Sequence, residues 1–390
     1  MNIQKIHLKR TKRINAGHLW IFSNEIYENP RIYAPGSLVE IYDMKNIFLG
    51  IGYINPHSLI SIRILTREKE SIDKEFFRRR ISEAIKLRVL LGQKDAMRLV
   101  FSEGDYIPGL IIDRYNECLV LQFLTSGIEA FRGLIIELID EMFSPEVIVL
   151  KNESRVRTLE GLPVYKEIVK GNLHKLPVIN EDGISFRIDP YEGQKTGFFL
   201  DQRENRIAVK QLIKQGRGLD LFCYTGAWSL HLASNGVEVT GVDESERAVT
   251  QAKNNAEING FHDRVKFIKD NVFAFLEKEL KSNEKKYDFI IADPPAFVKS
   301  ANRIKEAVNA YRELNEICIR LLKPSGIFVT SSCSYHISRE MFLDMLRSSG
   351  KSAGRNLRLL NLRSQSPDHP ILLSMPETEY LKCAFLLVDN

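Results

Sequence analysis

The chain has 390 residues, of which 44% are hydrophobic and 27% are charged. That length exceeds one ordinary domain, and that composition is typical of soluble globular proteins. The apolar runs, such as 119–124 and 384–388, have the length of strands and are far too short to span a membrane. The basic N-terminus MNIQKIHLKRTKR leads into no apolar signal region, so we expect a cytoplasmic protein without membrane association.

The charge is unevenly distributed along the chain. The net charge is +5, yet residues 1–80 hold 14 Lys and Arg against 8 Asp and Glu, which makes that segment +6 and leaves the rest near neutral. A basic end on a near-neutral body is typical of a module that binds polyanions such as RNA. A solvated basic surface would give the same count.

The five cysteines, at positions 118, 223, 318, 333 and 383, are widely spaced and form no CxxC pair. This spacing favours neither a disulfide framework nor a metal site, so we expect no metal and only free thiols. Cys118, Cys318 and Cys383 accompany apolar strands or a helix face, and we expect them in the core. For Cys223, in the loop at 222–226, a role as a small residue is favoured over catalysis.

The first half of the chain predicts two small domains. Residues 1–72 hold β-like runs at 38–42, 47–53 and 60–65, separated by Asn-Pro and Pro-Gly turns, which is typical of a small all-β unit. Residues 73–189 begin with a helical pattern from Asp73 that ends near Gly92. Strand-like runs at 110–113, 119–124, 147–150 and 184–188 and a helix at 128–142 then predict a middle α+β domain.

From residue 190 to 390, strands and helices alternate regularly. Strand-like runs lie at 218–222, 237–242, 265–268, 289–292 and 327–330, and the clearest helix spans 304–322. Alternation of this kind predicts a parallel, doubly wound sheet, and two tail strands at 357–362 and 381–388 would add a hairpin with one antiparallel strand.

The stretch GLDLFCYTGAWSLHLASNGVEVTGVDES, residues 218–245, predicts a nucleoside cofactor site. Ligands of parallel sheets bind beyond the carboxyl ends of the strands, where Asp243 would accept hydrogen bonds from ribose hydroxyls. The loop has one glycine, Gly226, and an acid, Asp220, at the end of its strand. A dinucleotide needs several glycines around its diphosphate, whereas a carboxylate suits the cationic amino-acid part of S-adenosylmethionine (SAM). SAM is therefore favoured over NAD, although Asp220 could instead only cap a turn.

Acids also follow the next two strands of the predicted sheet. Asp270 and Asn271 come after the third strand, where they would meet the adenine amino group. Asp293 opens the sequence DPP after the fourth strand, and the two prolines restrict the path of the loop that carries it.

The fifth strand ends at TSSCS, which predicts that Cys333 lies near Asp293 where a methyl group would be presented. Polar neighbours and the strand-end position favour a reactive thiol over a buried structural one. A thiolate that adds to carbon 6 of cytosine makes carbon 5 nucleophilic enough to accept a methyl group. Asp293 would stabilise the adduct.

Together these motifs resemble the RlmI-like family of SAM-dependent large-subunit ribosomal RNA cytosine-5 methyltransferases. The resemblance covers nearly the whole chain and rests on LKRTKRINAGHLWIFSNEI (8–26), SEGDYIPGLIIDRYN (102–116), GQKTGFFLDQRENR (193–206), DLFCYTGAWSL, DPPAF and TSSCS. It implies an N-terminal PUA-like β-barrel, a middle α+β domain and a Rossmann-like class I methyltransferase domain with a seven-stranded, mostly parallel sheet.

The resemblance also implies roles for individual residues. Cys333 and Asp293 would be catalytic, and RNA would contact Lys9, Arg10, Arg13, His18 and Trp20. The SAM site would be formed by Lys195, Phe198, Asp201, Arg203, Asp220, Phe222, Tyr224, Thr225, Gly226, Asp243, Glu244, Ser245, Asp270, Asn271 and Asp293.

The sequence leaves alternatives open. Many RNA cytosine-5 methyltransferases carry a second cysteine after the proline of the fourth-strand motif, but here the motif is DPPA, so the group that removes the carbon 5 proton is unassigned. RNA nitrogen methyltransferases often have an aromatic residue directly after [DN]PP, whereas Phe297 comes one place later. A non-catalytic RNA-binding or ribosome assembly factor is the third reading. The sequence also leaves a homodimer open.

Overall fold

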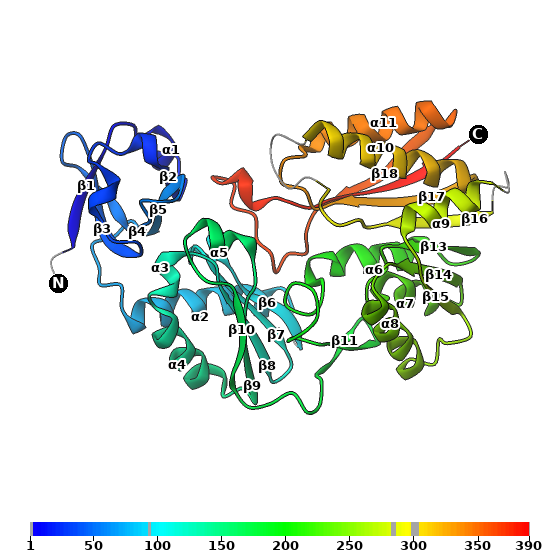
Figure 1. Ribbon diagram of the computed structural model, residues 1–390, viewed down its shortest axis with the longest axis horizontal. Helices are drawn as coiled ribbons and strands as arrows, with labels where there is room; N and C mark the ends of the chain where they lie inside the picture. The colour runs from blue at the N-terminus through cyan, green and yellow to red at the C-terminus, as the bar shows by residue number, and fades with distance from the viewer. Residues whose placement is uncertain (1–2, 93–94, 282–285, 298–303, 390) are drawn as a thin grey trace. The chain divides into compact units, whose positions relative to one another are not determined.

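The computed structural model describes residues 3–92, 95–281, 286–297 and 304–389. These residues form two compact units, each discontinuous in sequence, and each is described by itself (Figure 1). The first unit comprises residues 1–179, 188–200 and 367–378, and the second comprises 180–187, 201–366 and 379–390. Residues 180–187 thus belong to the second unit and residues 188–200 to the first. The sequence predicted three consecutive domains, and their boundaries stay a prediction.

The first unit begins with a five-stranded sheet in the order β1-β3-β4-β5-β2. Its strands are β1 (Gln4–Leu8), β2 (Trp20–Phe22), β3 (Ser37–Asp43), β4 (Phe48–Ile54) and β5 (Ile60–Thr66), with the short helix α1 (Lys12–Asn15) after β1. Apolar side chains of these strands, among them Ile6, Ile41 and Ile62, are buried in one cluster, to which Met375 of the tail also contributes. The three β-like runs of the predicted all-β segment correspond to β3, β4 and β5.

The rest of the first unit is an α+β fold around a second five-stranded sheet, in the order β10-β9-β8-β7-β6. Asp73 caps α2 (Lys74–Leu90) by accepting a hydrogen bond from the Phe76 amide, and the helix ends before Gly92, as predicted. The strands are β6 (Ala96–Phe101), β7 (Leu110–Tyr115), β8 (Cys118–Phe123), β9 (Val147–Asn152) and β10 (Tyr165–Lys170), and the other helices are α3 (Ser126–Glu129), α4 (Arg132–Phe143) and α5 (Arg155–Leu159).

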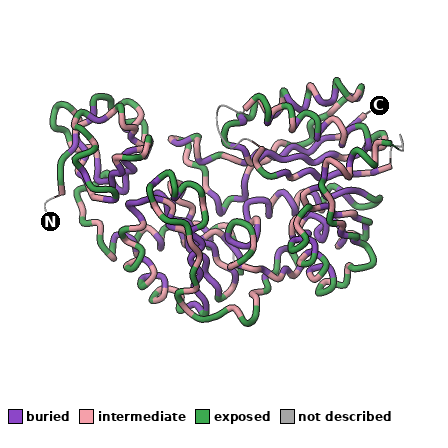
Figure 2. The backbone as a smooth tube through the Cα atoms, in the orientation of Figure 1, coloured by how far each residue is buried: buried purple, intermediate pink, exposed green. Residues whose placement is uncertain are grey.

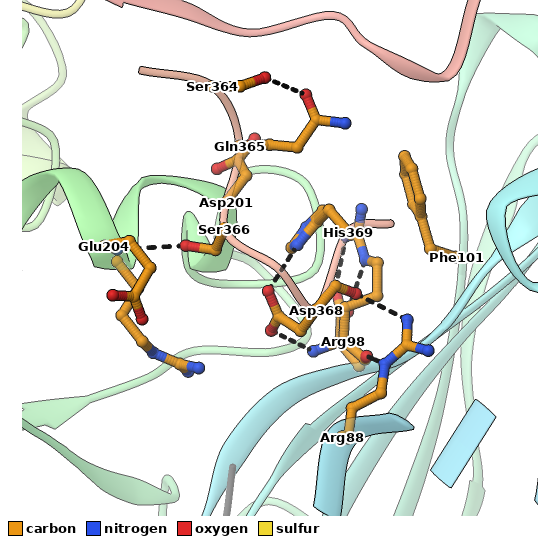
Figure 3. Close-up of polar contacts among 12 residues, drawn as sticks. Arg88, Arg98, Phe101, Asp201, Glu204, Ser364, Gln365, Ser366, Asp368 and His369 are labelled. Carbon is orange, nitrogen blue, oxygen red and sulfur yellow. Dashed lines mark hydrogen bonds and ion pairs between the residues drawn. The ribbon is translucent and has the colours of Figure 1, made fainter. Parts of the chain in front are cut away.

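Residues 367–378 return to the first unit from the C-terminal part of the chain. Asp368 is fully buried there: its carboxylate accepts hydrogen bonds from the Arg98 amide (3.0 Å) and meets His369 Nδ1 (2.8 Å), as Figure 3 shows. Its carbonyl accepts one from the guanidinium of Arg88 (2.6 Å), a fully buried arginine that also pairs with Asp105. This segment is therefore fixed by charged groups that satisfy one another away from water.

The second unit contains the predicted doubly wound sheet. The strand order is β15-β14-β13-β16-β17-β19-β18, with β13 to β17 parallel and β19 antiparallel to both of its neighbours. The strands are β13 (Arg217–Leu221), β14 (Glu238–Asp243), β15 (Val265–Lys269), β16 (Tyr287–Ala292), β17 (Leu322–Ser332), β18 (Leu357–Arg363) and β19 (Lys382–Val388). This seven-stranded, mostly parallel sheet confirms the predicted α/β fold class.

Helices cover both faces of this sheet (Figure 1), and most residues of its central strands are buried (Figure 2). The helices of this unit are α6 (Arg203–Leu212), α7 (Ala227–Ala233), α8 (Glu246–Ile258), α9 (Val272–Leu280), α10 (Ile304–Leu321) and α11 (Arg339–Ala353). A short hairpin of β11 (Val178–Glu181) and β12 (Ile184–Arg187) precedes α6. The helix predicted at 304–322 is α10, and Cys318 on it is fully buried, as expected.

Candidate active site

The carboxyl ends of β13, β14, β16 and β17 bring together the residues on which the proposed chemistry depends. Asp220 lies near the end of β13, Asp243 ends β14, Asp293 follows β16, and Cys333 follows β17. These strands are neighbours in the parallel part of the sheet, so their carboxyl ends share one edge. The sequence predicted this edge as the site.

Asp220 is a buried acid with one oxygen unsatisfied. Its Oδ2 accepts hydrogen bonds from the amide (3.0 Å) and hydroxyl (2.6 Å) of Ser229, and among the described residues its Oδ1 has no hydrogen-bond partner. Burial, together with the charges of Asp293 and Asp243, raises the pKa of Asp220 to about 7, although the Ser229 bonds lower it. The carboxylate does hold the first turn of α7, but a cation beside Oδ1 would relieve the remaining cost of burial. The site therefore fits the ammonium and sulfonium of SAM.

The loop from β13 to α7 is held in left-handed backbone conformations. Phe222, Tyr224 and Gly226 have φ angles of 63°, 47° and 83°. At Gly226 a Cβ would lie 2.7 Å from the ring of Phe267, so both the angle and the space require glycine. Thr225 beside it has a buried hydroxyl with no hydrogen-bond partner in the described part of the chain. The loop thus approaches its neighbours closely and leaves a second polar atom available to a ligand.

Asp243 ties this loop to the end of β14. Its carboxylate accepts hydrogen bonds from the Tyr224 amide (2.9 Å) and from the Ser245 amide (2.9 Å). Each carboxylate oxygen can accept more than one bond, so the arrangement is compatible with ribose hydroxyls as further donors. Ser245 itself caps α8 through the Ala248 amide, and Glu244 between them is exposed.

Asp270 and Asn271 both contact residues of α9. Asn271 accepts hydrogen bonds from the Phe273 and Ala274 amides and so caps that helix. Asp270 pairs with Lys278 at 2.9 Å, and this contact lowers the pKa of the acid. The predicted contact of these two residues with adenine stays a prediction.

Asp293 is oriented by two residues that sequence reasoning missed. Gln202 Nε2 donates to Oδ1 at 3.0 Å, and the indole N–H of Trp228 donates to Oδ2 at 3.0 Å. The same Gln202 amide donates to the hydroxyl of Ser331 on β17 at 3.1 Å, so it links the ends of β16 and β17. Gln202 and Trp228 are almost fully buried. The signal for Gln202 was its place in GQKTGFFLDQRENR, one of the motifs that carry the resemblance.

Cys333 differs from the other four cysteines in exposure. Cys118, Cys223, Cys318 and Cys383 are buried, whereas Cys333 is half-buried directly after β17. Burial raises the pKa of each of those four thiols, which makes them poor nucleophiles at neutral pH. Among the cysteines, position and exposure single out Cys333.

The motif GQKTGFFLDQRENR divides between the two units. Lys195, which has a φ of 49° and lies over the ring of Phe199, belongs with buried Phe198 to the first unit. Asp201 and Arg203 belong to the second unit, where Asp201 accepts a hydrogen bond from the Tyr380 hydroxyl at 2.7 Å. Contact of these four residues with SAM stays a prediction.

Arg203 lies against a buried acid of the second unit. Its Nε is 3.4 Å from Glu181, which also pairs with Arg206 (2.6 Å) and His231 (2.9 Å). Although burial opposes it, the charges and hydrogen bonds of these partners hold the pKa of Glu181 far below its usual range. The structure thus gives Arg203 a structural contact inside the unit.

The predicted RNA-contacting residues fall into two groups. Lys9 and Arg10 are exposed. Arg13 pairs with Glu25 at 3.1 Å, the Trp20 indole donates to Glu103 at 2.7 Å, and buried His18 faces Glu377 at 3.4 Å. Contact of all five with RNA stays a prediction, but Lys9 and Arg10 are the two that fold contacts leave most accessible.

Within the described residues, no group of three or more His, Cys, Asp or Glu side chains is arranged to hold a metal ion. No helix in that part of the chain is both long enough and apolar enough to cross a membrane.

Two family models match the chain. One describes a PUA-like domain and matches residues 5–67, and the other describes a methyltransferase domain and matches residues 213–369. Ribosomal RNA large subunit methyltransferase I of Tolumonas auensis is 37% identical over 96% of both chains. The protein of that name from Pseudoalteromonas atlantica is 34% identical over 97% of both chains.

The chain belongs to the ribosomal RNA large subunit methyltransferase I family. Among solved structures, SMU.776 complexed with SAH has a TM-score of 0.86 at 21% identity and covers 99% of this chain and 100% of its own. Trm5b from Pyrococcus abyssi has a TM-score of 0.52 at 16% identity, covering 70% of this chain and 73% of its own. At these identities the two solved structures show the fold alone. The family assignment identifies the chain as a SAM-dependent methyltransferase, and the fold agrees with it.

Proposed function

We propose that this methyltransferase modifies carbon 5 of a cytosine in large-subunit ribosomal RNA through a covalent bond to Cys333. The RNA class follows from the names of the family members. The observation that carries the chemistry is the position of Cys333, the one cysteine of the five that is not buried. It comes directly after β17, the neighbour of β16, and Asp293 comes directly after β16.

The reaction begins at the Cys333 thiolate. Its sulfur forms a bond to carbon 6 of the cytosine, and the electron pair of the carbon 5–carbon 6 double bond shifts to carbon 5 and is delocalised toward N3, which makes carbon 5 nucleophilic. SAM supplies an activated methyl group: carbon 5 bonds to it as the sulfonium–methyl bond breaks. Loss of the carbon 5 proton to a base and cleavage of the sulfur–carbon 6 bond then restore the aromatic ring and the thiolate.

In this proposal Asp293 acts on the base, and two hydrogen-bond donors hold its side chain in position. Because Gln202 and Trp228 each donate to one of its oxygens, the carboxyl group cannot rotate freely. In its protonated form the carboxyl group would donate a proton to N3 of the ring, where negative charge develops as the sulfur adds, and the proton would return to Asp293 as carbon 5 takes up the methyl group. A base in folded RNA would first have to leave its stack to reach this edge of the sheet. The residue that accepts the carbon 5 proton is unassigned.

The RNA nitrogen methyltransferase reading needs an aromatic side chain near Asp293 to stack on the base. Phe297 packs instead among aromatic residues of its own unit, 4.6 Å from the ring centroid of Tyr311 and 6.2 Å from that of Phe273. Phe297 is half-buried, and its ring also lies 6.4 Å from that of Phe222 in the cofactor loop, so the experiment below has to distinguish the two readings. A homodimer stays a prediction.

The test compares ribosomal RNA after incubation with the full chain and SAM. Nucleoside mass spectrometry should find 5-methylcytidine with the wild type, and Cys333→Ala should lower its formation by at least about 1,000-fold. Cys118→Ala, which removes a buried thiol of the first unit, is the control and should stay active. Methylated adenosine or guanosine in place of 5-methylcytidine, formed equally well by Cys333→Ala, would replace this proposal with the nitrogen reading.

A further inference from the structure

Lys382, the first residue of β19, is a buried lysine beside the end of β17. The two strands are antiparallel, with Lys382 opposite Ser332 and Cys383 opposite Ser331. Only 5% of the Lys382 surface is exposed. Sequence reasoning assigned this residue no role, and its neighbour Cys383 lies fully inside the core.

The ammonium group of Lys382 is held next to Cys333 by two backbone carbonyls. Its Nζ donates to the carbonyl of Ser334 at 2.8 Å and to that of Tyr380 at 2.9 Å. Because Ser334 directly follows Cys333, the first of these bonds fixes the ammonium group to the backbone of the residue after Cys333. Neutral carbonyls compensate only part of the cost of burying an ammonium, so a nearby anion would stabilise it.

The charges around Lys382 point to Cys333 as that anion. Burial lowers the pKa of Lys382 to about 8, while the charges of Cys333 and Glu379 raise it. Glu379 is exposed, so water screens its charge. From α10, buried Tyr311 shares a hydrogen bond with the Ser334 hydroxyl at 3.1 Å, and burial raises its pKa, so it stays neutral at physiological pH.

We propose that Lys382 is a positioning residue for the reaction: its ammonium group favours the thiolate form of Cys333 and fixes the turn that carries it. A cation beside a cysteine is a common means of making the thiol reactive at neutral pH. This inference rests on the proposed function for its purpose, but the charge interaction itself is measurable without RNA or SAM.

The test is the pH dependence of the reaction of Cys333 with iodoacetamide in the full chain, followed by peptide mass spectrometry. Removing the charge in Lys382→Met should move the midpoint of the rate profile upward by about one pH unit, which lowers the rate at neutral pH about tenfold. Lys382→Arg keeps the charge and should keep the midpoint. Lys323→Met is the matched control, because Lys323 lies at the other end of β17 and pairs with Asp288.

An unchanged midpoint in Lys382→Met would overturn the inference, and so would an equal shift in Lys382→Arg, since charge would then not be the cause. If Lys382→Met does not fold, the reciprocal measurement decides. In Cys333→Ala the midpoint for labelling Lys382 with an amine reagent should fall, because the thiolate no longer stabilises the ammonium, and no change would contradict the pairing.

The two proposals fail separately. A shifted alkylation midpoint with a fully active Cys333→Ala enzyme would leave the Lys382–Cys333 pair intact and remove the covalent mechanism. An unchanged midpoint with an inactive Cys333→Ala enzyme would remove the pair and keep the mechanism.

Discussion

The indole N–H of Trp228 donates a hydrogen bond to Asp293 across 3.0 Å, from the second residue of α7 to the loop after β16. This bond links α7, the helix that follows the cofactor loop, to the acid at the proposed methyl-transfer site. Trp228→Phe keeps an aromatic ring but removes the donor. We expect kcat/KM to fall about 10-fold to 100-fold, the usual effect of one lost hydrogen bond to a charged group, with little change in SAM affinity.

The measurement for Trp228→Phe is steady-state kinetics together with SAM binding by calorimetry. Phe273→Leu on α9 changes a partly buried aromatic residue that donates nothing to Asp293 and serves as the control. Equal loss of SAM affinity and of kcat/KM would show that Trp228 acts on the cofactor pocket and not through Asp293.

A pH dependence follows from Asp220. Because its pKa in the ligand-free chain is raised to about 7, the carboxylate forms only as the pH rises through that value. A cationic ligand binds the carboxylate, so SAM affinity should increase from pH 6 to pH 8 and level off above. Asp220→Asn should bind SAM about 10-fold to 100-fold more weakly at pH 8 and show a flatter profile between pH 6 and pH 8.

The raised pKa of Asp220 also predicts how the stability of the folded chain changes with pH. A folded-state pKa of about 7 lies above the ordinary value of 3.8, so the folded chain binds more protons than the unfolded chain between these values. Stability contributed by the protonated acid is therefore lost as the pH rises from about 4 through 7. Asp220→Asn should raise the Tm of the ligand-free chain by a few degrees at pH 8 and by less at pH 5. A lower Tm at pH 8 would contradict the burial argument.

Buried contacts of the tail segment at 367–378 should contribute strongly to the unfolding free energy of the first unit. Asp368→Ala removes a buried carboxylate that accepts a bond from the Arg98 amide, and we expect a loss of about 1–3 kcal/mol in unfolding free energy. Arg88→Met should cost about 3–5 kcal/mol, because it leaves Asp105 buried without its partner. Leu373→Ser, at a residue that is 97% exposed, is the control for denaturant unfolding and should be neutral.

RNA affinity should depend on the exposed cations of the N-terminal segment. Charge reversal of both Lys9 and Arg10 should weaken RNA binding and reduce the slope of log K against log salt by about one unit or more, since two phosphate contacts are lost. Arg347→Glu, a 75% exposed arginine on α11, is the control for net charge. Filter binding at several salt concentrations measures both, and an equal effect of the control would remove the assignment of these two residues.

The sequence predicted the second unit well because its signals are local. Apolar runs mark the strands of the parallel sheet, and the residues at or just beyond their carboxyl ends, Asp220, Asp243, Asp293 and Cys333, mark the candidate site. Parallel strands bring those ends to one edge whatever the helices between them contain, so the edge could be predicted before any contact was known.

Contacts between residues distant in sequence were beyond that reasoning. Gln202 reaches Asp293 and Ser331, Lys382 reaches the carbonyl of Ser334, and Asp368 returns to β6 across 270 positions. Nothing in the local pattern distinguishes such side chains from solvated ones. For the same reason the sequence could not show that three of the predicted RNA-contacting residues have acidic partners in the fold. These pairs are Arg13 with Glu25, His18 with Glu377, and Trp20 with Glu103.

The most direct test of the central claim uses an RNA fragment in which 5-fluorocytidine replaces cytidine, incubated with SAM and the full chain. A base cannot remove the fluorine from carbon 5 as it would remove a proton. The sulfur–carbon 6 bond therefore cannot break, and the methylated ring should stay bonded to the protein. Denaturing electrophoresis and peptide mass spectrometry should then find wild-type protein joined to RNA at Cys333, and no such species with Cys333→Ala. A wild-type enzyme that methylates ordinary RNA yet forms no bond to the fluorinated RNA, or a bond at another residue, would contradict the account.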